Sequence, residues 1–166
     1  MGQGYLSRVE FSPAWMRRLF NLYPPFRGAG IRVAHVAPDF RQVVVELHAR
    51  LLNRNFVGTH FGGSMFAMAD PFFMIMMMRN LGPGYVVWDK AGSIRFLKPG
   101  RGTLTARFEL TQAMVDEAVA RTADGSKHEP TFRVEITDGA GLPVAAVEKT
   151  LHIRRADSYR PRLAHN

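Results

Sequence analysis

The chain has 166 residues, of which 46% are hydrophobic and 22% charged, as is ordinary for one globular domain with a buried core. It contains no cysteine, so disulfides, thiolate nucleophiles and cysteine-ligated metal sites are excluded. The formal net charge of +8 favours an anionic partner, whether a nucleic acid, a membrane surface or a small molecule, although an arginine-rich C-terminal end with a predicted basic tail at 156–166 contributes part of it.

The N-terminal part predicts one short helix, at about residues 12–23. Ser12 and Pro13 are an N-cap and a first-turn proline, and the helix ends before Pro24. The segment ahead of it has neither an apolar stretch long enough for a signal peptide nor a convincing myristoylation signal. We therefore expect a soluble, cytoplasmic protein.

The rest of the chain predicts a sheet and one long helix. Alternating residues at 31–37 and 42–49 predict a hairpin, and after the loop 53–63 an apolar helix runs to about Arg79. Extended runs follow at 85–97, 103–112, 129–137 and 143–154, with an unassigned connection near 113–127. This order predicts an α+β fold for a single domain at 1–155, in which a curved antiparallel sheet wraps around one long hydrophobic helix, with a short N-terminal helix beside it.

The predicted helix is apolar on every side. Six of the nine methionines lie in residues 65–78. This segment is shorter than the roughly 20 residues that span a bilayer and is interrupted by Asp70-Pro71, so we expect a buried helix and no membrane partner. A curved sheet covers only one side of a helix, so we expect a second subunit or a bound apolar ligand to cover the other.

Asp70 is the one ionisable residue between Gly63 and Arg79, and two interpretations of it are open. Asp70-Pro71 is a common pair of N-cap and first helical residue, in which case residues 62–69 form something separate, such as a short helix. Alternatively the helix begins at Gly62-Gly63 and is kinked by Pro71, which puts Asp70 on the same face as Gly63, about 10 Å away. An acid would then share a groove with free N–H groups that attract an anion.

Three segments resemble one family. NFVGTHFGGSMFAMAD, from Asn55 to Asp70, resembles the signature of hotdog-fold acyl-CoA thioesterases of the phenylacetyl-CoA type. SIRFLKPGRGTLTARFEL and VEITDGAGLPVAAVEKTLHI resemble its later strand and turn and its final hairpin. The Asp-Pro pair and the segment VWDKAGSIRFLKPGRG make the chain most similar to the tetrameric acyl-CoA thioesterase, or DUF4442-like, branch. The resemblance covers about residues 30–154 and departs from the pattern at Phe61, where the family has His; here His60 comes one position earlier.

The resemblance implies a hotdog fold and hydrolysis of an acyl-CoA to a free acid and CoA. It implies that Asp70 is the nucleophile or general base, that the backbone N–H of Gly62 or Gly63 holds the oxyanion, and that Asn55 positions the carbonyl group or water. His60 either replaces the family's histidine through a shifted loop or is a structural hydrogen-bonding residue. The alternative function is a non-catalytic hotdog protein that binds acyl groups or acyl-CoA.

Coenzyme A is polyanionic, and Arg95, Lys98 and Arg101 at the FLKPGRG turn are candidates for its phosphates. Lys90 could instead pair with Asp89. The candidate acyl contacts are the apolar side chains Phe61, Phe66 and Met74. We expect no metal, no cofactor other than CoA as part of the substrate, and no nucleic acid, since no binding motif for one is present. We expect a homo-oligomer, a dimer or a dimer of dimers, and the resemblance implies that the acid and the oxyanion donor come from different subunits.

Overall fold

The computed structural model describes residues 12–158, so the expectations about the N-terminal segment and most of the predicted tail lie outside the described residues. The elements in chain order are α1 (Pro13–Leu22), α2 (Pro24–Ala29), β1 (Ile31–Val36), β2 (Gln42–His48), η2 (Leu51–Asn53), α3 (Gly62–Ala67), α4 (Phe72–Leu81), β3 (Tyr85–Phe96), β4 (Thr103–Glu109), α5 (Gln112–Arg121), β5 (Thr131–Thr137), β6 (Pro143–Arg155) and η3 (Ala156–Ser158).

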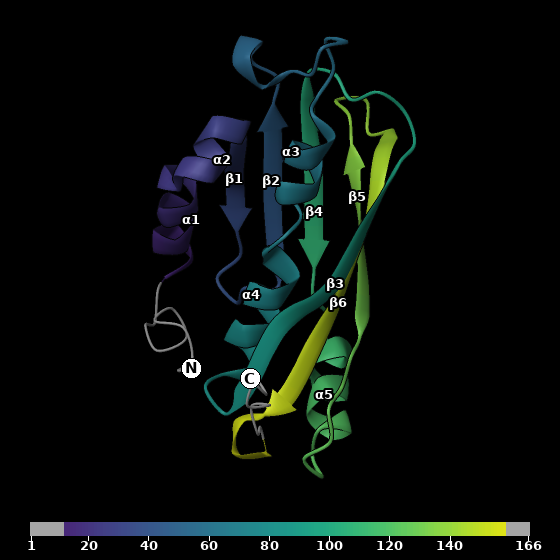
Figure 1. Ribbon diagram of the computed structural model, residues 1–166. Coiled ribbons are helices and arrows are strands. Elements are labelled where there is room, and N and C mark those ends of the chain that lie inside the picture. Colours follow the sequence, from purple (N-terminus) through teal and green to yellow (C-terminus); the bar gives the residue numbers. More distant parts are fainter. Residues whose placement is uncertain (1–11, 159–166) are drawn as a thin grey trace, which may run out of the picture.

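The strands form one antiparallel sheet of six, in the order β1-β2-β4-β5-β6-β3. The two longest strands pair almost end to end, from Tyr85 opposite Arg155 to Phe96 opposite Ala145. Helices α3 and α4 lie against one face of the sheet, which curves around them (Figure 1). The α+β arrangement and all of the expected strands are confirmed.

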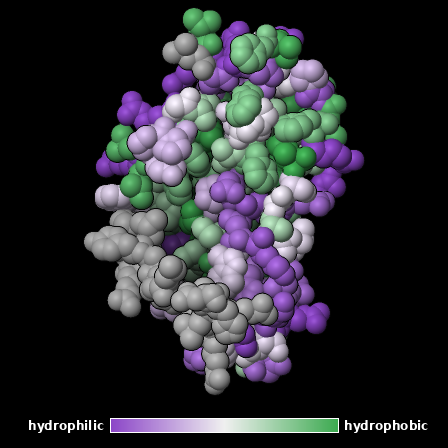
Figure 2. Space-filling model, viewed as in Figure 1, coloured by the Kyte–Doolittle hydropathy of each residue, from purple (hydrophilic) through white to green (hydrophobic). Residues whose placement is uncertain are grey.

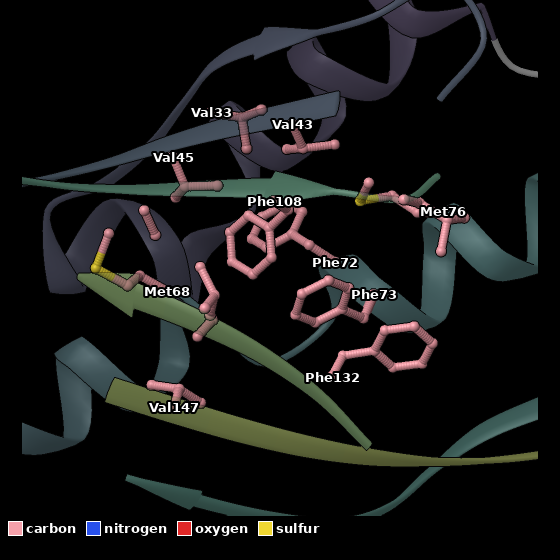
Figure 3. Close-up of a cluster of buried hydrophobic side chains, with 14 of the residues drawn as sticks. Val33, Val43, Val45, Met68, Phe72, Phe73, Met76, Phe108, Phe132 and Val147 are labelled. Atoms are coloured by element: carbon pink, nitrogen blue, oxygen red, sulfur yellow. The ribbon is translucent and has the colours of Figure 1, made fainter. Parts of the chain in front are cut away.

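The inner face of the sheet follows from strict alternation of apolar and polar residues. In β4, Leu104, Ala106 and Phe108 are fully buried, while the residues between them point away from the helices. Phe72 of α4 packs on Phe108 with ring centroids 5.1 Å apart, and Phe73 stacks on Phe132 at 5.0 Å. Figure 3 shows these rings gathered between the helix and the strands, so the helix is held by aromatic packing.

The central helix expected from the sequence begins at Gly62 but is broken into α3 and α4 by a turn at residues 68–71. The cause is Pro71, which has no N–H to donate and whose ring would clash with the carbonyl of Ala67 in a continuous helix. None of the described helices is long and apolar enough to cross a membrane.

Three further α-helices complete the fold of residues 12–158. The expected N-terminal helix is confirmed, with the Ser12 side chain accepting a hydrogen bond from the N–H of Trp15 at 3.2 Å. The structure adds α2 after it, and it adds α5 within the unassigned connection, where Thr111 is the N-cap. Helix α1 packs along β1, while β3 forms the opposite border of the sheet (Figure 1).

Candidate functional site

Asp70 lies at the break between α3 and α4, and its side chain is 56% exposed. Pro71 occupies the N-cap position of α4, and no side chain caps that helix. The interpretation of Asp70 as an N-cap is therefore wrong, although the separate short helix that went with it does form. Asp70 is also not inside a continuous helix, because Pro71 interrupts the helix directly after it.

The Asp70 carboxylate is bound by the side chain of Lys149, a residue of β6. The lysine Nζ donates to Oδ1 of Asp70 at 2.7 Å and lies 3.2 Å from Oδ1 of Asp89, on β3. The Lys149 side chain is only 3% exposed, and its ammonium lies 5.6 Å from the centre of the Phe66 ring. The sequence reasoning missed Lys149. Its signal was a single charge in the inward row of β6, between Val147 and Leu151.

Asp89 pairs with Lys149 and not with Lys90, the partner suggested by the sequence. Lys90 lies where the register of β3 against β6 shifts, and its Nζ bonds Oε2 of Glu129 at 2.5 Å instead. Burial raises the pKa of the Asp89 carboxyl, and the Lys149 ammonium offsets part of this effect. Asp70, Asp89 and Lys149 thus form one charge network built from three elements.

A pocket of about 430 Å³ lies beside the N-terminal end of α3. Its wall is made by the loop before α3, by Met65 of that helix, and by the turn after β3. The lining residues are Asn55, Thr59, His60, Gly62, Met65, Phe96, Leu97, Lys98, Pro99 and Gly100. Asn55, His60, Gly62 and Lys98 of the predicted site therefore meet here, whereas Asp70 is not among the lining residues.

Asn55 builds the loop that forms the pocket wall. Its Nδ2 donates to Oγ1 of Thr59 at 2.9 Å and to the His60 carbonyl at 3.4 Å. Its Oδ1 accepts from the N–H groups of Val57 and Thr59, at 3.1 and 3.0 Å. Both ends of the amide are thus engaged within the loop.

His60 ties this loop to the turn after β3. The residue is 2% exposed, its N–H donates to the Gly100 carbonyl at 3.0 Å, and its Nε2 lies 2.7 Å from the Gly102 carbonyl. A carbonyl oxygen only accepts, so Nε2 donates the proton in this hydrogen bond. Nδ1 is buried without a partner among the described residues.

Gly62 and Gly63 form the first turn of α3, where an α-helix leaves its N–H groups without acceptors in the helix. Aromatic rings approach both glycines closely. A Cβ on Gly62 would lie 2.8 Å from the Phe96 ring, and one on Gly63 would lie 2.4 Å from the ring of Phe61, which is itself exposed. The two glycines therefore leave room for these rings beside the helix start.

The remaining predicted contacts differ in their surroundings. Phe66 and Met74 are half-buried and pack against the core. Lys98 is bound to Asp138, with Nζ 2.7 Å from Oδ2, and this bond helps to hold the pKa of the Asp138 carboxyl below its usual range. Arg95 and Arg101 are exposed, and neither has an ion-pair partner within residues 12–158. Within residues 12–158, no cluster of side chains could hold a metal ion.

Comparisons with known proteins agree on one fold. The family described as "Domain of unknown function (DUF4442)" matches residues 13–153. The structure is similar to PA5026 from Pseudomonas aeruginosa, a protein of unknown function and probable thioesterase, with a TM-score of 0.74 and 19% identity over 84% of this chain and 93% of that one.

Two further structures are similar. Thioesterase HI1161 from Haemophilus influenzae has a TM-score of 0.64 and 14% identity over 97% of this chain and 99% of that one. The E. coli PaaI protein from the phenylacetic acid degradation operon has a TM-score of 0.59 and 22% identity over 84% of this chain and 92% of that one. The comparison with curated proteins gives no match. These likenesses confirm the hotdog fold that the sequence predicted.

Proposed function

This chain belongs to the DUF4442 family, and we propose that it is a thioesterase that hydrolyses the thioester of an acyl-coenzyme A to a free acid and CoA. The observation that carries the proposal is the Asp70 carboxylate, exposed at the break of an apolar helix with one oxygen bound to a buried ammonium. The Lys149 side chain is 3% exposed, and its ammonium would be costly to keep buried without a charged partner. The resemblance of the segment from Asn55 to Asp70 to thioesterase signatures and the shared fold support the proposal.

The proposed chemistry uses the second oxygen of Asp70. Oδ1 is bound to Lys149, while Oδ2 has no hydrogen-bond donor among the described residues. As a general base, Oδ2 takes a proton from a water molecule whose oxygen attacks the thioester carbon. As a nucleophile, it attacks that carbon itself and forms an anhydride, which water then hydrolyses. In both routes the carbon–sulfur bond breaks and the CoA thiolate leaves and takes up a proton.

The oxyanion formed at the carbonyl would be bound by N–H groups at the start of α3. Gly62 and Gly63 supply these groups, and the absence of side chains lets a carbonyl oxygen approach the backbone. Asn55 and His60 would support this site by holding the loop and the adjacent turn in place.

We propose that two copies of the chain complete the site. In one chain the pocket beside Gly62 does not include Asp70. Strand β3 is a twelve-residue border strand, exposed at Lys90–Ser93 and again at Arg95-Phe96. A long open strand edge pairs readily with another chain. Pairing of two β3 strands would bring Asp70 of one copy toward the pocket of the other, in a homodimer that could assemble further into a dimer of dimers.

The pocket and its surroundings suit an acyl-CoA. Met65, Phe96 and Leu97 give the pocket an apolar wall for the acyl group. Figure 2 shows hydrophobic side chains interspersed with hydrophilic ones over the upper half of the molecule. Phe61, Phe66 and Met74 are proposed as further acyl contacts. Arg95 and Arg101 are the better candidates for the CoA phosphates, because Lys98 is already bound to Asp138.

A non-catalytic acyl-CoA-binding protein is the second candidate. Two observations favour it. Lys149 pairs with Asp70, and the Phe61 ring fills the space beside Gly63 that a side chain would occupy. In this case Asp70 would serve the fold alone.

The test is a hydrolysis assay over acyl-CoA substrates of graded chain length, with released CoA measured by a thiol-reactive dye. The protein contains no cysteine, so every thiol detected is CoA. We expect turnover in the wild type and a loss of at least about 10²-fold in Asp70→Asn, which keeps the size of the side chain but removes its basicity. Asp116→Asn, a matched change on α5, should keep full turnover. Tight binding of acyl-CoA without any release of thiol would instead establish the non-catalytic candidate.

A further inference from the structure

Lys149 occupies an unusual place for a lysine. It lies on the face of β6 that is turned toward the helices, between Val147 and Leu151, both fully buried. Lysine is almost never buried this completely unless its ammonium is paired. Its burial in this row therefore requires an explanation from the groups that surround its ammonium.

The stem of Lys149 runs through a space that a neighbouring glycine leaves open. Gly92 lies opposite Lys149 across the β3–β6 pair. A Cβ at Gly92 would lie 3.1 Å from Cδ of Lys149 and 3.0 Å from Cζ of Phe66. The glycine thus lets the lysine stem and the Phe66 ring pack side by side, and this packing directs the ammonium toward the helix break.

Two carboxylates meet the ammonium from different elements. Asp70 comes from the helix break and is mostly exposed, and Asp89 comes from β3 and is 23% exposed. No other carboxylate of the described residues lies within 4.0 Å of this ammonium. Oδ1 of Asp89 is buried, and its contact with the ammonium is an ion pair without a hydrogen bond. The network therefore places two carboxyl groups against one ammonium.

The second carboxylate has a purpose if the charge of Asp70 changes. In both proposed routes Asp70 becomes neutral, because it gains either a proton or an acyl group. With Asp70 alone as its partner, the buried ammonium would then be left unpaired in an apolar interior, which is costly. Asp89, with Oδ1 3.2 Å from the ammonium, is a second carboxylate that can pair with it in that state.

We infer that Lys149 is a positioning residue, which fixes the carboxylate of Asp70 through Oδ1 and leaves Oδ2 free to react. Asp89 is the counter-ion that holds the ammonium in place while Asp70 is neutral. The inference rests on the proposed thioesterase function and deepens it. In this inference neither Lys149 nor Asp89 touches the substrate, and both act through Asp70.

The first test is a double-variant cycle on acyl-CoA hydrolysis. Lys149→Met keeps the length of the stem but removes the charge, and we expect kcat to fall about tenfold or more with KM changed less than about twofold. Because Lys149 acts through Asp70, the double variant Lys149→Met/Asp70→Asn should be no slower than Asp70→Asn alone. Lys127→Met is the matched control, because the Lys127 side chain is exposed and pairs with Glu129; it should keep the kcat of the wild type.

Asp89→Asn tests the counter-ion and is useful if Lys149→Met does not fold. It leaves the bond between Lys149 and Asp70 in place, so a merely structural role predicts an unchanged kcat. We expect kcat to fall at least about fivefold at unchanged KM, because the Lys149 ammonium then has no charged partner while Asp70 is neutral.

The outcomes separate this inference from the proposed function. A wild type that hydrolyses acyl-CoA, with Lys149→Met or Asp89→Asn folded and equally fast, overturns the inference and leaves the thioesterase function standing. The inference is also overturned if the kcat of the double variant falls by the product of the losses seen in Lys149→Met and Asp70→Asn. A wild type that binds acyl-CoA but releases no thiol refutes the thioesterase function, and the positioning role is refuted with it.

Discussion

The side-chain amide of Asn21 bonds both backbone groups of Val33. Nδ2 donates to the carbonyl oxygen at 3.0 Å, and Oδ1 accepts from the N–H at 2.8 Å. Val33 lies on β1, the border strand beside α1, so the amide satisfies the groups that a further strand would otherwise pair. Helix α1 thereby covers one edge of the sheet, and β3 is the other edge.

Replacing Asn21 by Leu should destabilise the fold. The change leaves a donor and an acceptor of the fully buried Val33 without partners, and we expect the free energy of unfolding to fall by about 1–3 kcal/mol. Urea denaturation followed by circular dichroism measures this change. Arg18→Ala, at an exposed position on the same helix, is the control and should unfold at the wild-type midpoint. An equal midpoint for Asn21→Leu would show that water satisfies these groups as well as the amide does.

We expect the wild type to be a dimer or a tetramer and the open edge of β3 to form its interface. The double variant Ala91→Glu/Ser93→Glu places like charges on both copies where two β3 strands would meet, and like charges opposite each other destabilise strand pairing. Light scattering at micromolar concentration should therefore give a smaller mass for this variant. The matched variant Ala113→Glu/Ala120→Glu, exposed on α5, should keep the wild-type mass. A monomeric wild type would refute the prediction.

The basic residues near the pocket should contribute unequally to CoA binding. Arg95→Gln and Arg101→Gln remove charges that have no ion-pair partner within the described part of the chain, whereas Lys98→Gln removes one already bound to Asp138. We expect the first two changes to raise KM for acyl-CoA more than the third, by about threefold or more at low salt. The difference should shrink as salt screens the phosphates. If all three variants keep the KM of the wild type at low salt, the phosphates bind elsewhere.

Glu129 should make the stability depend on pH in acid. Hydrogen bonds from Lys90, then His152 and Lys127, lower the pKa of this carboxyl from 4.5 to about 2. A pKa lowered in the folded state stabilises the fold above pH 4.5, and this stability is lost as the pH falls toward about 2. We therefore expect Glu129→Gln to lower Tm at neutral pH and to flatten the fall of Tm across this window. Glu148→Gln, at an exposed position of β6, should keep the wild-type slope.

The strands and the core helix could be predicted because their signals are local. In β4, alternation places Leu104, Ala106 and Phe108 on one face, and any register that buries this face gives the same strand. The apolar helix was evident for the same reason, since its composition requires burial. Helix α5 was missed because only two of its residues, Val115 and Ala118, are buried, so its pattern is mostly that of a surface.

The environment of Asp70 was decided only by the tertiary structure. The sequence marked Asp70 as a charge in an apolar segment, but its exposure depends on the side to which the Pro71 break turns it. Its partner Lys149 is 79 residues away, and Asp89 comes from a third element. A local pattern cannot bring such residues together, because contact between them depends on the β3–β6 register and on how the helices pack across the sheet. The sequence by itself therefore determined which residue needs an explanation, and the packing of three distant segments determined what surrounds it.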